Sequence, residues 1–176
     1  MVVTALATAT TAALWLYLYT GQLDNHRSDR SLQPDLYIDQ PHWTLFNRQG
    51  QIHSQLHAGR LEQWPDENSA RLTEPLFDIS DQKQRQWRAT ARRGRINPDD
   101  QSILLEQHVV LKRKPDNHDL VIKTGKLHIT QNGDAIETDD AVVLVAGSWH
   151  FTAMGLRTRL GQQRLELLNK VRGRHE

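Results

Sequence analysis

The sequence predicts an all-β fold of short antiparallel strands in about four repeated units, preceded by one N-terminal transmembrane helix. Three observations lead to this prediction. The chain starts with an uncharged segment, a repeat of roughly 33 residues follows it, and alternating apolar and polar runs are separated by turn sequences. Helix signals are nearly absent after residue 24. We therefore expect a membrane anchor followed by one β domain.

The first segment, Val2–Thr20, contains no charged residue and no Asn, Gln, Gly or Pro. As a helix rising about 1.5 Å per residue it would reach roughly 28 Å, close to the hydrocarbon thickness of a bilayer. Trp15 and two tyrosines gather at one end, where aromatic rings favour the membrane interface. A cleaved signal peptide is the alternative, but a basic start and an A-x-A-like site are missing. We expect a retained anchor at 2–20 and a polar linker at 21–33.

The composition excludes several classes of function. The net charge is +1, and Lys and Arg are spread along the chain, which argues against a dedicated nucleic-acid domain. The absence of cysteine excludes a disulfide framework, a thiolate zinc site and a cysteine nucleophile. His53 and His57 would lie roughly 13 Å apart along a strand, too far to share one ion. Since no G-x-S-x-G or phosphate-loop motif is present either, we expect no catalytic residue, metal or cofactor.

Two charged features have ordinary structural interpretations. The carboxylate pairs Asp99–Asp100 and Asp139–Asp140 fall at turns or strand starts, where solvated turn chemistry is the favoured interpretation over acid–base catalysis. In the run WRATARRGR, Arg88 and Arg92 alternate with Trp87, which indicates a solvated outer face. An anionic partner for this run, such as lipid headgroups, is the weaker alternative.

The repeat predicts which side chains point inward. Its units span about 42–74, 75–107, 108–140 and 141–173, and equivalent positions of strands can line one interior because side chains alternate across a strand. The columns of equivalent positions are Ala70, Ile103, Ile136 and Leu165; Leu72, Leu105, Thr138 and Leu167; Leu56, Ala89 and Ile122, with Ser54, Trp87 and Leu120 beside them; and Trp43, Leu76, Val109 and Val142. A sandwich core explains most of them, but an open-ended stack would also form a continuous apolar channel able to hold acyl chains.

The order of several segments resembles a known family. After the N-terminal span come PDLYIDQPHWTLFNRQGQIHSQLHAGRLEQWPD, LTEPLFDI, WRATARRGRI, LLEQHVVLKR, LVIKTGKLHI, ETDDAVVL and LELLNKVRGRHE. Together they resemble the LptC family, the bitopic inner-membrane component of the lipopolysaccharide export bridge. The resemblance covers nearly the whole chain. It implies an open twisted β-jellyroll at residues 34–176 in the periplasm, which receives lipopolysaccharide from the inner-membrane Lpt ABC transporter and passes it to the soluble bridge protein LptA.

The resemblance also implies site residues. Trp43, Leu72 and Leu165 match the family's lipid contacts, Gly147 matches a glycine at a tight bend, and His175 stands where the closing strand usually has an aromatic residue. The predicted lipid-binding set is Trp43, Leu45, Leu56, Ala70, Leu72, Leu76, Trp87, Ala89, Ile103, Leu105, Val109, Ile122, Ile136, Val142, Leu165 and Leu167. The predicted partner-binding set is Ile38, Trp43, Gly147, Leu165, Leu167 and Val171.

The closing run LELLNKVRGRHE predicts a strand with an open edge, which is a template for another strand. We expect Arg164–Arg172 to pair with the first strand of LptA. Ile38–Asn47, together with the transmembrane helix, should meet the transporter. Two alternatives remain open: a membrane-anchored periplasmic β scaffold that binds another amphiphile or only protein partners, and a periplasmic enzyme.

Overall fold

The computed structural model describes residues 33–65, 67–80, 86–114, 120–130, 135–159 and 164–175. The chain divides into two compact units, Met1–Pro34 and Asp35–Glu176, and every strand among the described residues belongs to the second unit. The predicted transmembrane segment at 2–20 and the linker up to residue 32 lie outside the described residues. Within the described ranges, no helix is long and apolar enough to cross a membrane.

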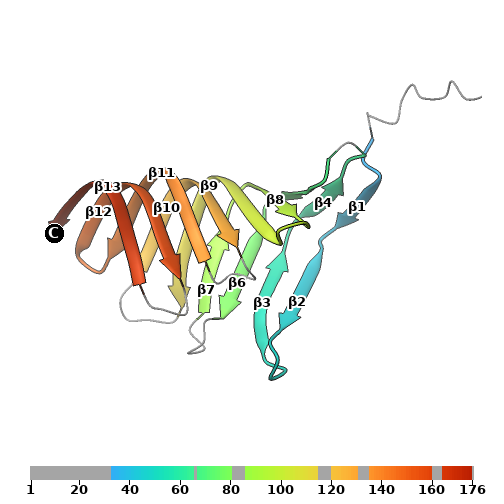
Figure 1. Cartoon of the computed structure of the whole chain (residues 1–176), viewed down its shortest axis with the longest axis horizontal. Coiled ribbons are helices and arrows are strands. Elements are labelled where there is room, and N and C mark those ends of the chain that lie inside the picture. Colours follow the sequence, from blue (N-terminus) through green and yellow to red (C-terminus); the bar gives the residue numbers. More distant parts are fainter. Residues whose placement is uncertain are drawn as a thin grey trace, which may run out of the picture. The chain divides into compact units, whose positions relative to one another are not determined.

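The second unit is built from antiparallel strands joined in one 13-stranded sheet (Figure 1). These strands are β1 (Leu36–Asp39), β2 (His42–Phe46), β3 (Ile52–His57), β4 (Arg60–Gln63), β5 (Ala70–Thr73), β6 (Leu76–Ser80), β7 (Gln86–Thr90), β8 (Arg93–Asn97), β9 (Ser102–Lys114), β10 (Leu120–Thr130), β11 (Ala135–Ala146), β12 (Trp149–Arg159) and β13 (Arg164–His175). The prediction of an all-β domain with antiparallel pairing is confirmed.

A line of kinks divides this sheet into two halves. The order β1-β4-β5-β8-β9 forms the first half and β2-β3-β6-β7-β9 the second, while β9 to β13 run through both. At the kinks the backbone N–H of Gln40 donates to the carbonyl oxygen of Gly59 (2.9 Å). The backbone N–H of Glu74 likewise donates to the carbonyl oxygen of Arg92 (2.9 Å). The positive φ angles of Gln40, Glu74 and Gln107 recur at the spacing of the sequence repeat. Each repeat is therefore a pair of strands bent at its middle.

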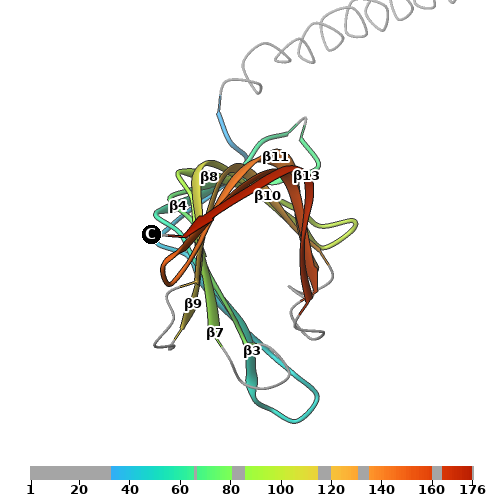
Figure 2. The ribbon, with the colours of Figure 1, turned by 90° about the vertical axis from the view of Figure 1, so that its left-hand side faces the viewer.

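The bend turns the two halves toward each other. In Figure 2, which views the second unit from the β13 end, they form the two limbs of an arch that is open on one side. Side chains directly opposite each other in an antiparallel pair point to the same face of the sheet, so the strand register identifies the inward positions. Such an arch is an open jellyroll, as the family resemblance implies.

Two inward rows cross the first half of the sheet, and we call them rows A and B. Row A contains Leu36, Gln63, Ala70, Ile96, Ile103, Ile129, Ile136, Thr158 and Leu165. Row B contains Ile38, Leu61, Leu72, Gly94, Leu105, Leu127, Thr138, Leu156 and Leu167. Two of the columns predicted from the repeat fall in these rows, so their inward orientation is confirmed.

Rows C and D are the inward rows of the second half. Row C contains Trp43, Leu56, Phe77, Ala89, Leu111, Ile122, Leu144, Phe151 and Gly173. Row D contains Leu45, Ser54, Ile79, Trp87 and Arg113 and, on the later strands, Leu120, Ala146, Trp149 and His175. The middle of the rows is closed core: Leu105 and Ala89 are fully buried, whereas Trp43 at the β2 end is 42% exposed.

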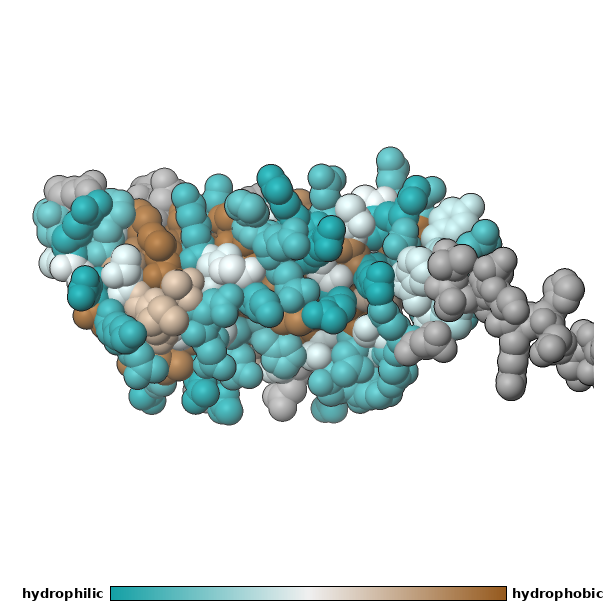
Figure 3. Space-filling model, turned by 90° about the horizontal axis from the view of Figure 1, so that it is seen from above, coloured by the Kyte–Doolittle hydropathy of each residue, from teal (hydrophilic) through white to brown (hydrophobic). Residues whose placement is uncertain are grey.

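The outer face carries ion pairs, so the solvated outer face predicted for Arg88 is confirmed. The Arg88 guanidinium donates two hydrogen bonds of 2.6 Å to the Asp78 carboxylate, which raises the pKa of Arg88. Glu106 lies between Arg95 (3.2 Å) and Lys126 (3.5 Å). The face in Figure 3 is accordingly mostly hydrophilic, with its largest hydrophobic group toward the β12–β13 end.

Candidate functional site

An apolar cavity lies between the two halves of the sheet at the β2–β3 end. Its volume is about 430 Å³, and none of its lining residues is charged. The lining residues are Trp43, Thr44, Leu45, Ser54, Leu56, Phe77, Ile96, Asn97, Pro98, Gln101, Ile103 and Ile129. They come from β2, β3 and β6 on one side and from β8, β9, β10 and the β8–β9 turn on the other. A concave apolar wall with a few neutral polar groups suits an aliphatic ligand.

The β8–β9 turn forms one wall of this cavity, and its sequence NPDD explains its shape. The Asn97 side-chain oxygen accepts a hydrogen bond from the backbone N–H of Asp99 (3.0 Å), and Asp100 accepts one from the N–H of Ser102 (3.0 Å). The bonds from Ser102 lower the pKa of the Asp100 carboxyl. The interpretation of Asp99–Asp100 as turn chemistry is therefore confirmed.

The cavity brings together Trp43, Leu45, Leu56 and Ile103 from the predicted lipid-binding set. Sequence reasoning missed four apolar lining residues, which are Phe77, Ile96, Pro98 and Ile129. The run LFDIS contains a sequence signal for Phe77, because the apolar Phe77 and Ile79 alternate with the polar Asp78 and Ser80. In the structure Phe77 and Ile79 are buried and their neighbours are half-buried.

One member of a predicted column, Leu76, is wrong. Leu76 pairs with His57 and Thr90 on the outer face, so it does not share the inward side of Trp43. Val109 and Val142 do point inward, but they lie beside the kink, where both pair with Thr124. The step of 33 residues fails here because the kinks differ between the repeats.

The difference between the kinks is visible in the backbone. One residue with positive φ, Glu74, precedes Leu76, whereas two, Gln107 and His108, precede Val109. One extra residue at a bulge moves every following side chain to the other face of the strand. Equivalent positions of the repeat therefore face opposite sides of the sheet.

Apart from Leu76, the remaining predicted lipid-binding residues point inward but lie outside this cavity. Those in the middle of the sheet are buried against one another. They are Leu72, Trp87, Ala89, Leu105, Val109, Ile122, Ile136 and Val142, and the partly buried Ala70 packs against them. Leu165 and Leu167 on β13 are partly buried and pack against this core. The apolar interior is continuous across the sheet, but its middle is filled by side chains rather than open.

An aromatic cluster lies at the opposite end of the sheet, on β12 and β13. The Trp149 ring stacks on Phe151 with centroids 5.9 Å apart and meets the edge of His175 at 4.9 Å. His175 also lies 2.9 Å from the Ser148 hydroxyl. The neighbouring Gly147 has a φ of +59° in the β11–β12 turn, so the predicted tight bend is confirmed. Its predicted contact with a partner stays a prediction.

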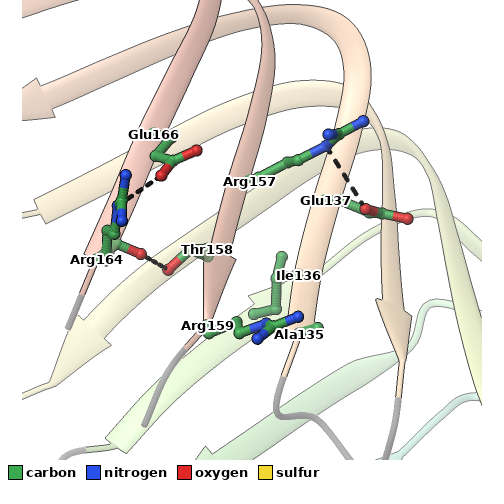
Figure 4. A pocket seen from close by; sticks show the side chains of 8 residues that line it. All are labelled: Ala135, Ile136, Glu137, Arg157, Thr158, Arg159, Arg164 and Glu166. Atoms are coloured by element: carbon green, nitrogen blue, oxygen red, sulfur yellow. Dashed lines mark hydrogen bonds and ion pairs between the residues drawn. The ribbon is translucent and has the colours of Figure 1, made fainter. Parts of the chain in front are cut away.

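A second pocket, of about 410 Å³, lies over β11, β12 and β13 and is charged (Figure 4). Arg157 pairs with Glu137 at 3.8 Å, Arg164 pairs with Glu166 at 2.5 Å, and the Thr158 hydroxyl donates to the carbonyl oxygen of Arg164 at 2.8 Å. Its two carboxylates, Glu137 and Glu166, thus each pair with one of its three guanidinium groups. This pocket is therefore an ion-paired surface rather than an apolar binding site.

His42 and His57 lie on the outer face of the second half. The rings of His42 and His57 stack with centroids 4.0 Å apart across β2 and β3. Within the described part of the chain, no group of three or more His, Asp or Glu side chains could hold a metal ion.

Comparison with known families gives a match over residues 2–176, to the LptC family, described as lipopolysaccharide-assembly, LptC-related. The chain belongs to the LptC family. Comparison with curated proteins gives no match. Membership of the LptC family implies a role in lipopolysaccharide transport, as an inner-membrane-associated bridge component rather than an enzyme.

Proposed function

We propose that this LptC-family chain binds the acyl chains of lipopolysaccharide between the two halves of its sheet. In this proposal it receives the lipid from the inner-membrane ABC transporter and passes it to the soluble periplasmic bridge protein LptA. Residues 2–20 anchor it in the inner membrane, 21–33 form a linker, and 34–176 form the periplasmic domain. The family match and the open antiparallel sheet support this proposal.

The single observation that carries the proposal is the uncharged cavity between the sheet halves. Trp43 and Leu45 expose 42% and 46% of their surface there, although both point inward. Exposed apolar side chains on an inner wall are a typical feature of a binding site for an apolar ligand. Burial of this surface by an acyl chain would contribute about 25 cal/mol for each Å² removed from water.

Because the middle of the interior is closed, passage of a lipid through it requires the two limbs to move apart. Side chains such as Leu105 and Ile122 fill the space between the halves. A lipid that travels from the β2 end to the β13 end must therefore separate the two limbs. The open side of the arch allows this movement without breaking strand pairing within either limb (Figure 2).

The two ends of the sheet offer edges for protein partners. In the described residues, β1 pairs with β4 alone, β2 with β3 alone and β13 with β12 alone. Their free backbone groups can extend the sheet into a neighbour. We propose that β1 and β2, including Ile38 and Trp43, face the transporter. We propose that β13, with Leu165, Leu167 and Val171, pairs with LptA close to the Gly147 turn.

Site-specific photocrosslinking in cells tests the lipid-binding proposal. A crosslinker at Trp43 or Phe77 should label lipopolysaccharide, because both side chains line the cavity. Leu76 is a matched control, since it is an apolar residue of the same strand as Phe77 but lies on the outer face. Equal labelling from Phe77 and Leu76 would contradict the proposal. Protein adducts without lipid adducts at Trp43 would support the alternative of a scaffold that binds only proteins.

A further inference from the structure

The outer face of the second half of the sheet is basic. Two rows of side chains cross this face, and we call them rows E and F. Row E contains His42, His57, Leu76, Thr90, Val110, Lys123, Val143, Thr152 and Arg172. Row F contains Thr44, Gln55, Asp78, Arg88, Lys112, Val121, Val145, His150 and Arg174. The one carboxylate in these rows is Asp78, so their basic side chains are in excess.

The outer face of the first half has nearly as many acidic as basic side chains. Its two rows are Tyr37, Glu62, Arg71, Arg95, Leu104, His128, Glu137, Arg157 and Glu166, and Asp39, Arg60, Thr73, Arg93, Glu106 and Lys126. Ion pairs hold most of these charges: Arg60 lies 2.8 Å from Asp39, and Glu106 lies between Arg95 and Lys126. The excess of positive charge is therefore a property of the second half rather than of the whole sheet.

The carboxylate of Asp78 is already occupied, since it accepts both hydrogen bonds of Arg88. Lys112 lies directly opposite Arg88 on the neighbouring strand and diagonally across from Lys123. Lys112, Lys123 and Arg172 are exposed, and none of them pairs with a carboxylate of the described residues. Like charges that face each other across adjacent strands are unfavourable, and an anionic surface laid against them would remove this repulsion.

Valines fill the space between these cations. Val143 lies opposite Lys123 and is 42% exposed, and Val110, Val121 and Val145 are half-buried on the same face. Rows E and F contain no Trp, Tyr or Phe, which are enriched at protein interfaces, whereas lysine is depleted there. Lysines around an apolar surface are typical of elements that lie on anionic membranes. The composition thus favours a membrane over a protein partner.

We infer that Lys112, Lys123 and Arg172, with the valines between them, dock this outer face onto the anionic headgroups of a bilayer. The inference rests on the proposed function in one respect, the anchor at 2–20. A linker of residues 21–33 spans at most about 45 Å, so the tethered domain stays near the membrane and a weak attraction is sufficient.

Docking fixes the direction of the sheet relative to the bilayer. Rows E and F run across the strands from β2 to β13, so both ends of the sheet lie close to the membrane in the docked state. A bridge that reaches LptA must leave the membrane. The docked state is therefore the state of the chain before LptA binds, and pairing of β13 with LptA competes with docking.

Fluorescence quenching in nanodiscs tests this inference on the full-length protein. The chain has no cysteine, so Val143→Cys provides a single site for a fluorophore. Thr73→Cys is the matched control, because Thr73 is an exposed neutral residue of the first half's outer face. Lipids with a nitroxide headgroup should quench the label at 143 more than the label at 73. This difference should appear in discs of phosphatidylethanolamine and phosphatidylglycerol and should disappear in phosphatidylcholine or at high salt.

Charge variants identify the cations responsible. Replacement of Lys112, Lys123 and Arg172 by Gln should lower the ratio of docked to undocked protein about fivefold for each cation removed. The control replaces Arg60, Arg93 and Lys126 by Gln, which removes the same charge from the first half and should leave quenching at 143 unchanged. Thermal unfolding confirms that each variant is folded, and the single variant Lys123→Gln serves if the triple variant is not.

Three results would overturn the inference. Equal quenching at 143 and 73, or in both kinds of disc, would mean that this face has no preference for an anionic surface. An equal loss in the control variant would show a general effect of net charge. If lipid does not quench the label at 143 but added transporter or LptA shields it, the face is a protein interface instead.

The discs contain no lipopolysaccharide, so docking is measured independently of lipid transport. If crosslinkers at Trp43 and Phe77 fail to label lipopolysaccharide while the label at 143 is quenched, the proposed lipid binding fails and the inference stands. If an alkaline wash removes the chain from the discs, the proposed anchor fails. Docking is then judged by cosedimentation with phosphatidylglycerol vesicles, and the inference is wrong if no salt-sensitive binding is found.

Discussion

Phe151 and Gly173 face each other across β12 and β13, and the Phe151 ring covers the glycine. A Cβ atom on residue 173 would lie 2.8 Å from Cε1 and 3.0 Å from Cδ1 of this ring. The absence of a side chain therefore lets Phe151 lie against the backbone of the last strand. This contact joins β13 to the apolar interior, because Phe151 packs against the buried core.

We predict that Gly173→Ala destabilises the domain by about 1–2 kcal/mol, since the Phe151 ring must move to admit a methyl group. Chemical denaturation of the full-length protein measures the effect. Gly59→Ala is the control, because its Cβ would meet the nearest atom, the Thr73 carbonyl oxygen, at an ordinary 3.5 Å. Equal stability of Gly173→Ala and wild type would mean that the ring does not hold this position.

Gly155 combines backbone strain with crowding. Its φ is +90°, and a Cβ would meet Leu168 Cδ1 at 2.9 Å and the Thr138 carbonyl oxygen at 3.3 Å. Gly155→Ala should cost about 2–4 kcal/mol of folding stability. Gly50 has a φ of +76° but open space around it. Gly50→Ala should therefore cost only the free energy of holding a non-glycine residue at positive φ, about 1 kcal/mol. A larger loss for Gly50→Ala than for Gly155→Ala would contradict this account.

Leu105 and Leu104 are neighbours that differ in the face they occupy. Leu105 is fully buried in row B, whereas Leu104 pairs with His128 on the outer face. Leu105→Arg should therefore destabilise the domain by several kcal/mol, because a charge would be buried without a partner, and Leu104→Arg should cost far less. Thermal unfolding distinguishes them. Two equally stable variants would show that the middle of the interior is open to solvent.

The hydrogen bonds from Ser102 lower the pKa of the Asp100 carboxyl. A lowered pKa in the folded state means that the contribution is present at neutral pH and is lost as the pH falls through the folded-state pKa. We predict that Asp100→Asn is less stable than wild type at pH 7 and that this difference shrinks below about pH 4. Thermal melts across the acid range measure it. A difference that stays constant with pH would contradict a role for the charge.

The last strand carries both core contacts and the proposed partner edge. Leu165 and Leu167 pack against the core, while Val171 is 49% exposed. A chain shortened after Leu167 should stay folded but lose capture of LptA. Deletion of 164–176 should also lower the melting temperature. Copurification with LptA checks the first point, and undiminished capture by the shorter chain would overturn the proposed role of this edge.

The sequence alone determined the strand content, the repeat and most inward positions. Alternation in runs such as QLHA and WRATARR is a local property, because successive side chains of a strand point to opposite faces. Residues such as Leu56, Ala89 and Ile103 were therefore assigned to the interior correctly. The order of the segments also pointed to the family that residues 2–176 match.

Only the tertiary structure decided which face the side chains after each kink occupy and which residues lie opposite each other across the interior. A bulge adds a residue without a marked sequence signal, and the extra residue before Val109 turns Val109 inward although Leu76, one repeat earlier, points outward. That Trp43 and Ile129 line one cavity, and that Arg113 pairs with Trp87, depends on strands that are distant in the sequence. Long-range pairing is set by the packing of the whole sheet, and no local pattern encodes it.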